Sequence, residues 1–271
     1  MSHWQDKVAV VTGGSAGFGW ALTQSLAQAG AKVVMADCDQ QQLHESLNRL
    51  HASGHVAAGF PVDVTNPDQV RSLIEKSVHQ FGRLDLLANI VGRSARGNLL
   101  DTPAEKFREY LEVNFLSMVH CTQAAASHLI QSRGHLVNMG SLAAKSAARF
   151  LGAYPVSKFA VAAYSQQLRY ELSPLGVHVL LVCPGPMARR DAGRRYDNEA
   201  ANLPAAAKQP GGGVKLTGIP PEKLAAKVLR ACERRVPELV VPSRARLLFA
   251  ILQLSPKWGD WLLRTVTHGQ A

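Results

Sequence analysis

Short apolar runs alternate with longer amphipathic segments along most of the chain. In the longer segments, apolar residues return every three or four positions, which is the period of a helix with one buried face. The short runs are rich in Val, Leu and Ala and predict strands at 7–11, 32–36, 56–64, 84–89, 135–139, 177–182 and 239–241. Strands that alternate with helices are typical of a parallel sheet covered on both faces. The pattern therefore predicts an α/β domain with a doubly wound, mostly parallel, seven-stranded sheet and helices on both faces.

Prolines help to place the helices between these strands. A proline is tolerated only in the first turn of a helix, where its missing N–H has no partner to lose, so Pro67 marks a helix start. The same rule applied to Pro155 puts Tyr154 at the entrance of a helix. Further helices are predicted at 20–29, 103–118, 154–171 and 221–234.

Two C-terminal stretches do not fit the alternation. Residues 186–221 are rich in Gly, Ala and Arg and include Gly211–Gly213. The segment is longer than loops without a function usually are, so we expect a substrate lid. Residues 244–271 follow the last strand, which leaves 1–243 as the main domain. This tail places Trp258, Trp261 and many leucines among basic residues and predicts an amphipathic helical segment. It would lie on a membrane surface, cover the cleft or form a subunit contact.

Composition and charge narrow the class of protein. The 271 residues suffice for one domain with a large core. Most of the net charge of +10 lies in residues 189–271, which hold 15 Lys and Arg against 7 Asp and Glu. No nucleic-acid recognition motif accompanies this charge, so we expect no nucleic-acid partner.

The cysteines and the N-terminus point to a reducing compartment. Cys38, Cys121, Cys183 and Cys232 are scattered, without Cys-x-x-Cys pairs or histidines at ligand spacing, so we expect neither a disulfide framework nor a metal site. The N-terminus is polar, and no apolar run approaches the roughly 18 residues of a membrane span. These features favour a cytoplasmic protein.

Tyr154 and Lys158 are candidates for proton transfer. Their spacing of four puts the phenol and the ammonium on one face of a helix. A tyrosine has a pKa near 10, so acid–base work at neutral pH requires a shift of roughly 2 to 3 units. A lysine about 4 Å away supplies on the order of 4 kcal/mol of attraction for the phenolate. Ser141 follows the strand at 135–139, so its hydroxyl could hydrogen-bond a substrate oxygen.

These residues belong to a larger set of motifs. The set comprises the glycine-rich turn Thr12–Gly19, Asn89, Asn114, Ser141, the Tyr154/Lys158 pair and Pro184–Gly185. In the order and spacing of these motifs, residues 5–242 resemble the short-chain dehydrogenase/reductase family. The resemblance implies a single Rossmann-type domain, a nicotinamide cofactor and a catalytic tetrad of Asn114, Ser141, Tyr154 and Lys158.

The glycine-rich turn has the context that a dinucleotide site requires. It follows a strand and opens a helix, so backbone N–H groups and a helix N-terminus can meet a pyrophosphate. The resemblance assigns cofactor contacts to the Tyr154/Lys158 pair and to Gly13, Ser15, Gly17, Phe18, Gly19, Asp37, Asp63, Val64, Asn89, Gly92, Pro184, Gly185 and Met187.

Asp37 favours NAD over NADP. It follows the second strand, where a carboxylate can accept hydrogen bonds from the adenosine ribose. A 2′-phosphate there would face like charge, and neither Ala16 nor Cys38 supplies the cation of phosphate-binding relatives. If Asp37 only capped the next helix, the missing cation would have no explanation.

Three positions need comment against the family pattern. The usual Asn-Asn-Ala-Gly reads Asn89-Ile90-Val91-Gly92, and we expect packing to compensate for the amide that Ile90 removes. Arg189 replaces a threonine, which puts recognition of the nicotinamide amide there in doubt. Asn114 is unfavourable inside a helix. The resemblance implies that it distorts the helix and holds a water in a proton relay.

The leading hypothesis is an NAD-dependent oxidoreductase that interconverts a secondary alcohol and a ketone. Tyr154 would be the general acid/base, and the substrate would be apolar or lipid-like. The alternatives are an NADPH-dependent ketoreductase of acyl thioesters and a nucleotide-binding regulator without turnover. The resemblance also implies a homo-oligomer, a dimer or tetramer, and the basic tail suggests peripheral contact with a membrane surface.

Overall fold

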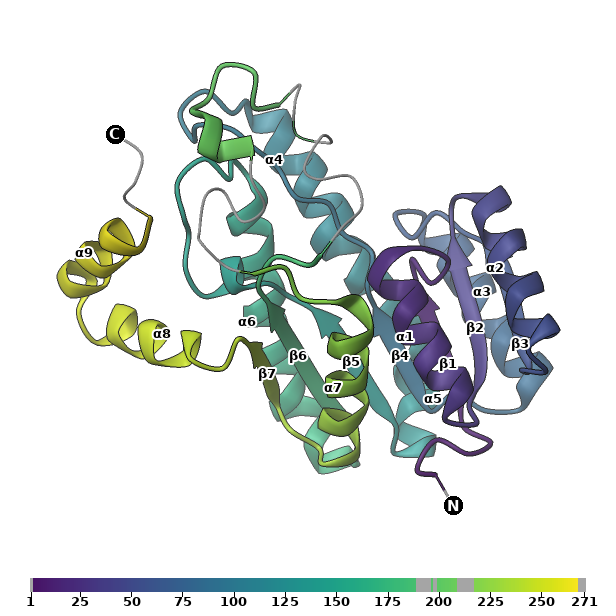
Figure 1. Ribbon diagram of the computed structural model, residues 1–271. Helices are drawn as coiled ribbons and strands as arrows, with labels where there is room; N and C mark the ends of the chain where they lie inside the picture. Colours follow the sequence, from purple (N-terminus) through teal and green to yellow (C-terminus); the bar gives the residue numbers. More distant parts are fainter. Residues whose placement is uncertain (1, 189–195, 197–198, 209–216, 268–271) are drawn as a thin grey trace.

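A computed structural model of the chain describes residues 2–188, 196, 199–208 and 217–267. Within them, seven strands form one sheet in the order β3-β2-β1-β4-β5-β6-β7, and each neighbouring pair is parallel (Figure 1). The strands are β1 (Val8–Thr12), β2 (Lys32–Asp37), β3 (Ala57–Pro61), β4 (Leu86–Asn89), β5 (His135–Met139), β6 (His178–Pro184) and β7 (Glu238–Val241). The predicted fold class is confirmed.

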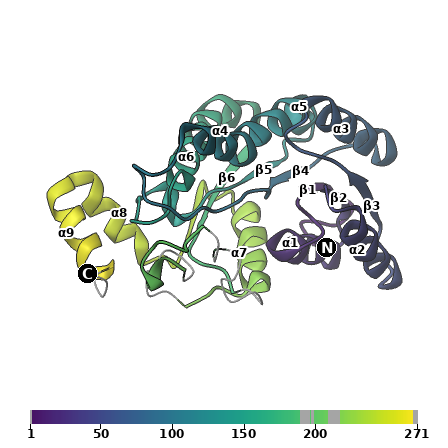
Figure 2. The same ribbon diagram turned by 90° about the horizontal axis from the view of Figure 1, so that it is seen from above.

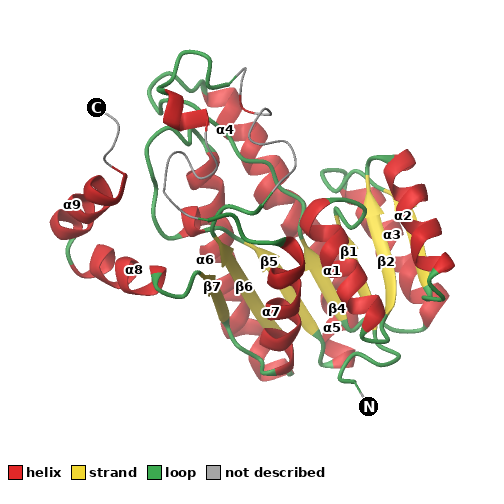
Figure 3. Ribbon diagram, in the orientation of Figure 1, coloured by secondary structure: helices red, strands yellow, loops and turns green. Residues whose placement is uncertain are grey.

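Helices cover both faces of the sheet, as the view from above shows (Figure 2). One layer contains α1 (Gly17–Gln28), α2 (Gln40–Ala52) and α7 (Pro221–Glu233). The other contains α3 (Pro67–Phe81), α5 (Ser117–Ser132) and α6 (Tyr154–Leu172), with α4 (Ala104–Leu111) leading into α5. Figure 3 shows the strands enclosed between these helices.

The central strands are apolar without alternation because both of their faces are covered. In β1 all five residues are buried, and successive side chains enter opposite halves of the core. Ala9 and Val11 pack on the α1 and α7 side, whereas Val10 packs on the α3 and α5 side. The burial of both faces therefore explains why the strands appeared in the sequence as short apolar runs.

Several predicted boundaries need correction. Strand β4 begins at Leu86 rather than at residue 84, and β6 ends at Pro184 rather than at residue 182. Helix α1 begins at Gly17 rather than at Trp20. Strand β3 ends at Pro61 rather than at Val64, because its neighbour in the sheet, β2, ends at Asp37 opposite Pro61. The helix predicted at 103–118 is not continuous, since α4 gives way to a π-helical turn at Glu112–Leu116 before α5 continues to Ser132.

The two ends of the predicted lid segment, 186–221, lie side by side. Met187 forms a parallel bridge with Ile219, and the Ala188 N–H donates to the Ile219 carbonyl at 2.9 Å. A short 3-10 turn, Ala205–Lys208, lies between these ends. Arg189, Arg190, Arg194, Arg195 and Gly211–Gly213 lie outside the described residues.

The tail consists of two helices, α8 (Ala245–Leu254) and α9 (Pro256–Thr267), that stand out from the β7 edge of the sheet (Figure 1). Pro256 disfavours a helical conformation at the residue before it, and Ser255 is accordingly extended, with φ −150° and ψ 105°. A Cβ at Gly259 would overlap Leu252, so the glycine allows the two helices to pack closely.

Candidate active site

The glycine-rich turn after β1 is built for a close ligand. Gly13 and Gly17 have φ angles of 63° and 53°, which favour glycine, and the space where a Cβ of Gly17 would stand is open. A Cβ at Gly19 would overlap the Gly13 carbonyl, so only glycine allows the turn to close there. The turn leads into the N-terminus of the 12-residue helix α1, which has no acidic residue in its first turn. No side chain caps this N-terminus, so its backbone N–H groups can hold an anion such as a pyrophosphate.

Asp37 is tied to this turn. Its Oδ2 accepts hydrogen bonds from the Ser15 hydroxyl at 2.5 Å and from the Ser15 N–H at 3.3 Å. Asp39, not Asp37, caps α2, since its side chain accepts from the Gln42 N–H. The Phe18 side chain is buried in the core beneath the turn, so a cofactor contact from Phe18 would come from its backbone.

The loops after β3 and β4 complete this side of the site. The Asp63 carboxylate accepts from the Thr65 N–H at 2.9 Å and hydroxyl at 2.7 Å, while Val64 beside it is buried. Asn89, at the end of β4, donates to Asn138 Oδ1 at 3.0 Å. The Ile90 side chain packs against the core. The Ile90 N–H donates to the Thr12 hydroxyl at 3.0 Å, so the local backbone is held to β1.

Asn114 lies in the π-helical turn and is completely buried. Its Oδ1 accepts from the Arg93 N–H at 2.7 Å, and its Nδ2 donates to the Arg93 carbonyl and the Ser157 hydroxyl, both at 2.9 Å. A Cβ at Gly92 would stand 3.1 Å from Asn114 Oδ1 and 3.2 Å from Lys158 Nζ. The π turn therefore brings Asn114 against the backbone beside Lys158, and Gly92 makes room for both.

Tyr154 and Lys158 are brought together at the start of α6. Tyr154 is the first residue of the helix, as Pro155 predicted, and is partly exposed. Lys158 is buried, with its Nζ 6.0 Å from the Tyr154 ring centroid and donating to the Met139 carbonyl at 2.7 Å. Burial lowers the pKa of Lys158 to about 8, so the side chain remains mostly an ammonium at neutral pH.

Ser141 lies just beyond the carboxyl end of β5 and is partly exposed. Its Oγ accepts from the Ala143 N–H at 3.1 Å, which fixes the start of the short 3-10 turn Leu142–Ala144. On the neighbouring strand, Pro184 ends β6 and the Gly185 N–H donates to the Val241 carbonyl at 2.7 Å. Met187 follows at the base of the lid segment. The predicted residues thus gather at the carboxyl ends of the strands.

Arg96 is a residue of this region that sequence reasoning missed. Its guanidinium is buried, lies 3.7 Å from the Tyr196 ring centroid and donates to the Ala207 carbonyl. Its N–H donates to Glu199 at 2.9 Å, so the described part of the lid segment docks on Arg96. Burial lowers the pKa of Arg96, with Tyr196, Glu199 and Tyr154 partly opposing this shift. Nothing in the local sequence distinguishes this arginine from solvent-exposed ones.

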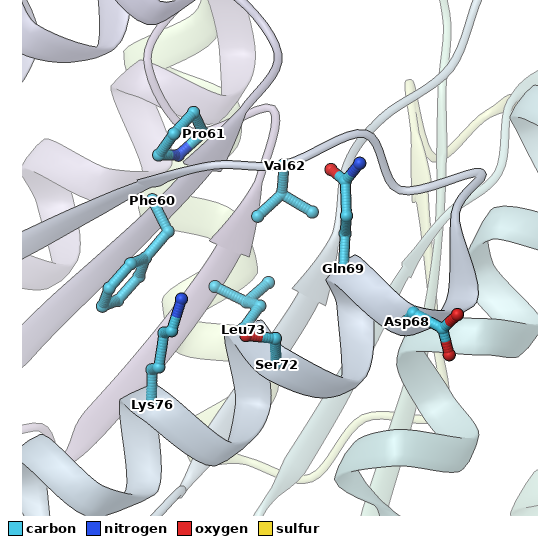
Figure 4. A pocket seen from close by; sticks show the side chains of 8 residues that line it. All are labelled: Phe60, Pro61, Val62, Asp68, Gln69, Ser72, Leu73 and Lys76. Carbon is cyan, nitrogen blue, oxygen red and sulfur yellow. The ribbon is translucent and has the colours of Figure 1, made fainter.

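A pocket of about 370 Å³ lies elsewhere, at the β3 edge of the sheet (Figure 4). It is lined by Phe60, Pro61, Val62, Asp68, Gln69, Ser72, Leu73 and Lys76. None of these residues belongs to the Tyr154 region, so the pocket is separate from the candidate catalytic groups.

Comparison with known proteins identifies the family. A family model described as short chain dehydrogenase matches residues 7–199. The chain belongs to the short-chain dehydrogenase family. An uncharacterized oxidoreductase of Staphylococcus epidermidis is 32% identical over 209 residues, which is 75% of this chain and 90% of that protein. This short-chain dehydrogenase is accordingly an oxidoreductase.

Two further relatives extend the comparison. Dehydrogenase/reductase SDR family member 7B of Danio rerio is 34% identical over 188 residues, covering 67% of this chain and 61% of the relative. The crystal structure of LigD in its apo form, from Sphingobium, matches with a TM-score of 0.76 at 23% identity and covers 91% of this chain and 94% of LigD. This second likeness concerns the fold alone.

The family implies a nicotinamide nucleotide, NAD or NADP, and the residues present fit such a group. The open space at Gly17, the exposed N-terminus of α1 and the Asp37 carboxylate beside the same turn provide for a pyrophosphate and a ribose. Beyond them along the sheet, Lys158 and Tyr154 lie where β5 ends.

Proposed function

We propose that this short-chain dehydrogenase interconverts a secondary alcohol and a ketone with NAD(H), and that Tyr154 exchanges the hydroxyl proton. The observation that carries the proposal is the buried Lys158 ammonium, held by the Met139 carbonyl 6.0 Å from the ring centroid of Tyr154. A nicotinamide nucleotide, when bound, supplies or accepts the hydride. Proton exchange with the substrate oxygen is then the task that falls to the protein.

Each catalytic group has a role that follows from its position. Lys158 stabilises the phenolate form of Tyr154, because it is a cation in a buried environment where charge interactions are strong. Ser141, at the end of β5, donates a hydrogen bond to the substrate oxygen. Asn114 holds the Arg93 backbone beside Lys158 and helps the proton relay between Lys158 and solvent.

An apolar substrate agrees with the surroundings of Tyr154. Its ring packs against a cluster formed by Ala95, Tyr110, Ala153 and Phe107. The nearby Arg96 guanidinium is engaged by the Tyr196 ring and the Ala207 carbonyl. The surroundings of the Tyr154 ring are therefore mainly hydrocarbon, which favours apolar alcohols over charged ones.

Replacement of Tyr154 by Phe tests the reaction. We expect turnover of an alcohol identified from a broad panel to fall about 10²–10⁴-fold, while NADH binding, followed by fluorescence, changes far less than turnover. Tyr164→Phe, on the same helix and with a partly buried ring, is the matched control and should keep full turnover. A Tyr154→Phe variant that retains most of its turnover would exclude the proposed role.

The cofactor and the class of protein are tested separately. We expect NADH to bind more tightly than NADPH in a fluorescence titration, because the Asp37 carboxylate would repel a 2′-phosphate. Tighter NADPH binding would favour the alternative, a ketoreductase of acyl thioesters. Tight NADH binding without turnover of any steroid, acyl or polyol substrate would favour a nucleotide-binding regulator.

We also propose a homodimer formed through the outer surface of α6 and the adjoining end of the π-helical turn Glu112–Leu116. Large apolar side chains are exposed on this surface: Leu116, Val156, Phe159 and Tyr170 are 38%, 44%, 42% and 69% exposed. A second copy would bury them, since the same patch on both subunits is self-complementary about a two-fold axis. In sedimentation velocity, Tyr170→Glu should shift dimer towards monomer and Val56→Glu, 54% exposed at the β3 edge, should not. A monomeric wild type would exclude the dimer.

The tail is proposed to bind the surface of anionic membranes. Leu247, Leu254, Trp258 and Trp261 are 70%, 86%, 72% and 64% exposed on α8 and α9, with Arg244, Arg246 and Lys257 beside them in the sequence. Apolar insertion and about 1 kcal/mol for each nearby cation would add on such a surface. Among the described residues, no helix has the length and apolar character to cross a bilayer.

Sedimentation with liposomes tests this contact. We expect the full chain to bind anionic but not neutral vesicles, less at high salt, and binding to disappear when residues 244–271 are removed. The double variant Trp258→Ser/Trp261→Ser should bind at least tenfold more weakly, whereas Leu100→Ser, changed at a 99% exposed leucine outside the tail, should bind normally. Equal, negligible binding in all cases would leave the tail as a cleft cover or subunit contact.

A further inference from the structure

Three buried side chains with metal-binding atoms meet at the end of the sheet opposite Tyr154. His135 is the first residue of β5 and His178 the first of β6, and the two are partners in the parallel register. Cys232 lies one residue before the end of α7. One potential ligand atom from each of the three lies within 4.8 Å of the others, and all three residues are buried.

The hydrogen bonds of the two histidines restrict where their protons are. His178 Nε2 lies 2.8 Å from the Val236 carbonyl, which can only accept, so this nitrogen carries a proton. In the neutral ring, its Nδ1 then presents a lone pair. That lone pair faces His135 Nδ1 at 3.0 Å.

Lys7 restricts the protons at the other end of this series of hydrogen-bond contacts. Lys7 Nζ, a donor, lies 2.9 Å from His3 Nε2, so this nitrogen of His3 presents a lone pair. His3 Nε2 lies 3.3 Å from His135 Nε2, which can donate to this lone pair if it carries the proton of His135. His135 Nδ1 is then a lone pair as well.

With this placement of protons, two lone pairs meet between the rings of the buried histidines. With neutral imidazoles and a charged Lys7, the lone pairs of His135 Nδ1 and His178 Nδ1 face each other at 3.0 Å. In the opposite tautomer, His135 Nδ1 would donate to His178 Nδ1, and the lone pair of His135 Nε2 would face the exposed His3. Two converging nitrogen lone pairs beside a thiol form the arrangement that a metal cation satisfies.

We propose that this cluster is a structural site for a divalent transition metal of the zinc class, bound by Nδ1 of His135, Nδ1 of His178 and Sγ of Cys232. Zinc takes imidazole and thiolate ligands in tetrahedral geometry with Zn–N distances of about 2.0–2.1 Å, which separates two nitrogens by roughly 3.3 Å. The observed separation of 3.0 Å is close to this value. The Cys232 thiol loses its proton to solvent as the Zn–S bond forms.

The remaining polar contacts suit a metal site. The His178 Nε2 proton goes to the Val236 carbonyl, and the His135 Nε2 proton goes to His3, so both rings are oriented by the nitrogen that does not bind the metal.

The position of the cluster indicates a structural role rather than a catalytic one. Trp4 is 1% exposed and donates its Nε1 proton to Glu233 at 3.0 Å. Its ring lies beside that of His135, with 5.4 Å between the ring centroids. The metal would therefore join β5, β6, the end of α7 and the N-terminal segment, while Lys158 binds the opposite end of β5 through Met139. Its removal should lower stability and leave the catalytic groups in place.

Metal content of the natural chain, produced without a histidine tag, tests the site. We expect about one equivalent of zinc per chain after dialysis. After chelation and addition of Co(II), we expect tetrahedral d–d absorption and a thiolate-to-cobalt band in the near ultraviolet. Addition of Zn(II) to the metal-free chain should raise Tm by at least about 2–4 °C at saturating metal.

Matched variants locate the ligands. Cys232→Ala should lose the thiolate band and bind Zn(II) about 10–100-fold more weakly, whereas Cys121→Ala, which removes another buried thiol, should bind normally. His178→Gln keeps a donor for Val236 but removes the metal-binding nitrogen, and should also weaken binding. A tag-free wild type with less than about 0.1 equivalent of metal, no cobalt spectrum and no Zn(II) shift in Tm would overturn the proposal, as would an unchanged thiolate band in Cys232→Ala.

Discussion

The two ends of strands β5 and β6 place polar groups in opposite surroundings. At the carboxyl ends, Ser141 and Tyr154 are partly exposed beside loops, and buried Lys158 lies just behind them. At the amino ends, His135 and His178 are buried, and His135 lies beside Trp4 in the N-terminal segment. Polar groups next to loops can meet a substrate, whereas polar groups sealed in the core can serve only internal contacts or a resident ion.

The two ends also differ in how their charge is stabilised. Lys158 is a buried cation whose Nζ donates to the Met139 carbonyl. Burying this charge costs free energy of folding, but a buried ammonium can assist proton transfer. At the amino end, each histidine nitrogen faces a partner, so the cluster is suited to stabilise the fold. The comparison therefore predicts that changes at the carboxyl end affect turnover and changes at the amino end affect stability.

The largest expected effect is that of Lys158→Met. Turnover should fall about 10²–10⁴-fold, because Tyr154 loses the cation that stabilises its phenolate. Stability should rise, because the folded pKa of about 8 lies below the ordinary 10.5 and the wild-type chain is penalised below pH 8.

The size and pH dependence of this gain can be measured by urea unfolding. At pH 7 it should be up to about 3 kcal/mol, and it should shrink as the pH rises from about 8 to 10.5, because the unfolded chain then also loses the proton. A variant that is less stable than the wild type at every pH would show that the Met139 hydrogen bond outweighs the cost of burying Lys158.

A smaller effect is expected for Asp37→Ala at the cofactor end. The change removes a carboxylate that accepts from both the N–H and the hydroxyl of Ser15. Loss of its repulsion and of its ribose contact should reduce the ratio of NAD to NADP affinity by about 10–100-fold, as measured by fluorescence titration of each reduced nucleotide. Asp39→Ala, which removes the cap of α2 but not the carboxylate at Ser15, is the control and should leave the ratio unchanged.

The smallest effect is expected for Trp4→Phe at the amino end. The smaller ring leaves a cavity and breaks the hydrogen bond to Glu233, which should lower the free energy of unfolding by about 1–3 kcal/mol. Turnover per folded molecule should not change, because the residue is remote from Tyr154. Trp258→Phe, at a 72% exposed tryptophan, should alter neither property. A marked loss of turnover in Trp4→Phe would break the distinction between the two ends.

Local sequence signals determined much of the fold and of the candidate site. The strand at 135–139 and the helix start at Tyr154 were predicted at the residues where they occur, because the apolar run and the sterics of Pro155 act on near neighbours in the chain. The glycine-rich turn and Asp37 were predicted in the same way. The predicted catalytic roles remain to be tested.

Features that depend on distant residues were decided only by the tertiary structure. Arg96 is buried because Tyr196, Glu199 and Ala207 pack against it from a distant part of the chain. His135 and His178, 43 residues apart, meet only through the register of β5 and β6, and Cys232 joins them from a helix packed across the sheet. Spacing along the chain therefore determined the elements and the motifs within them, whereas strand register and helix packing determined which side chains from different elements became neighbours.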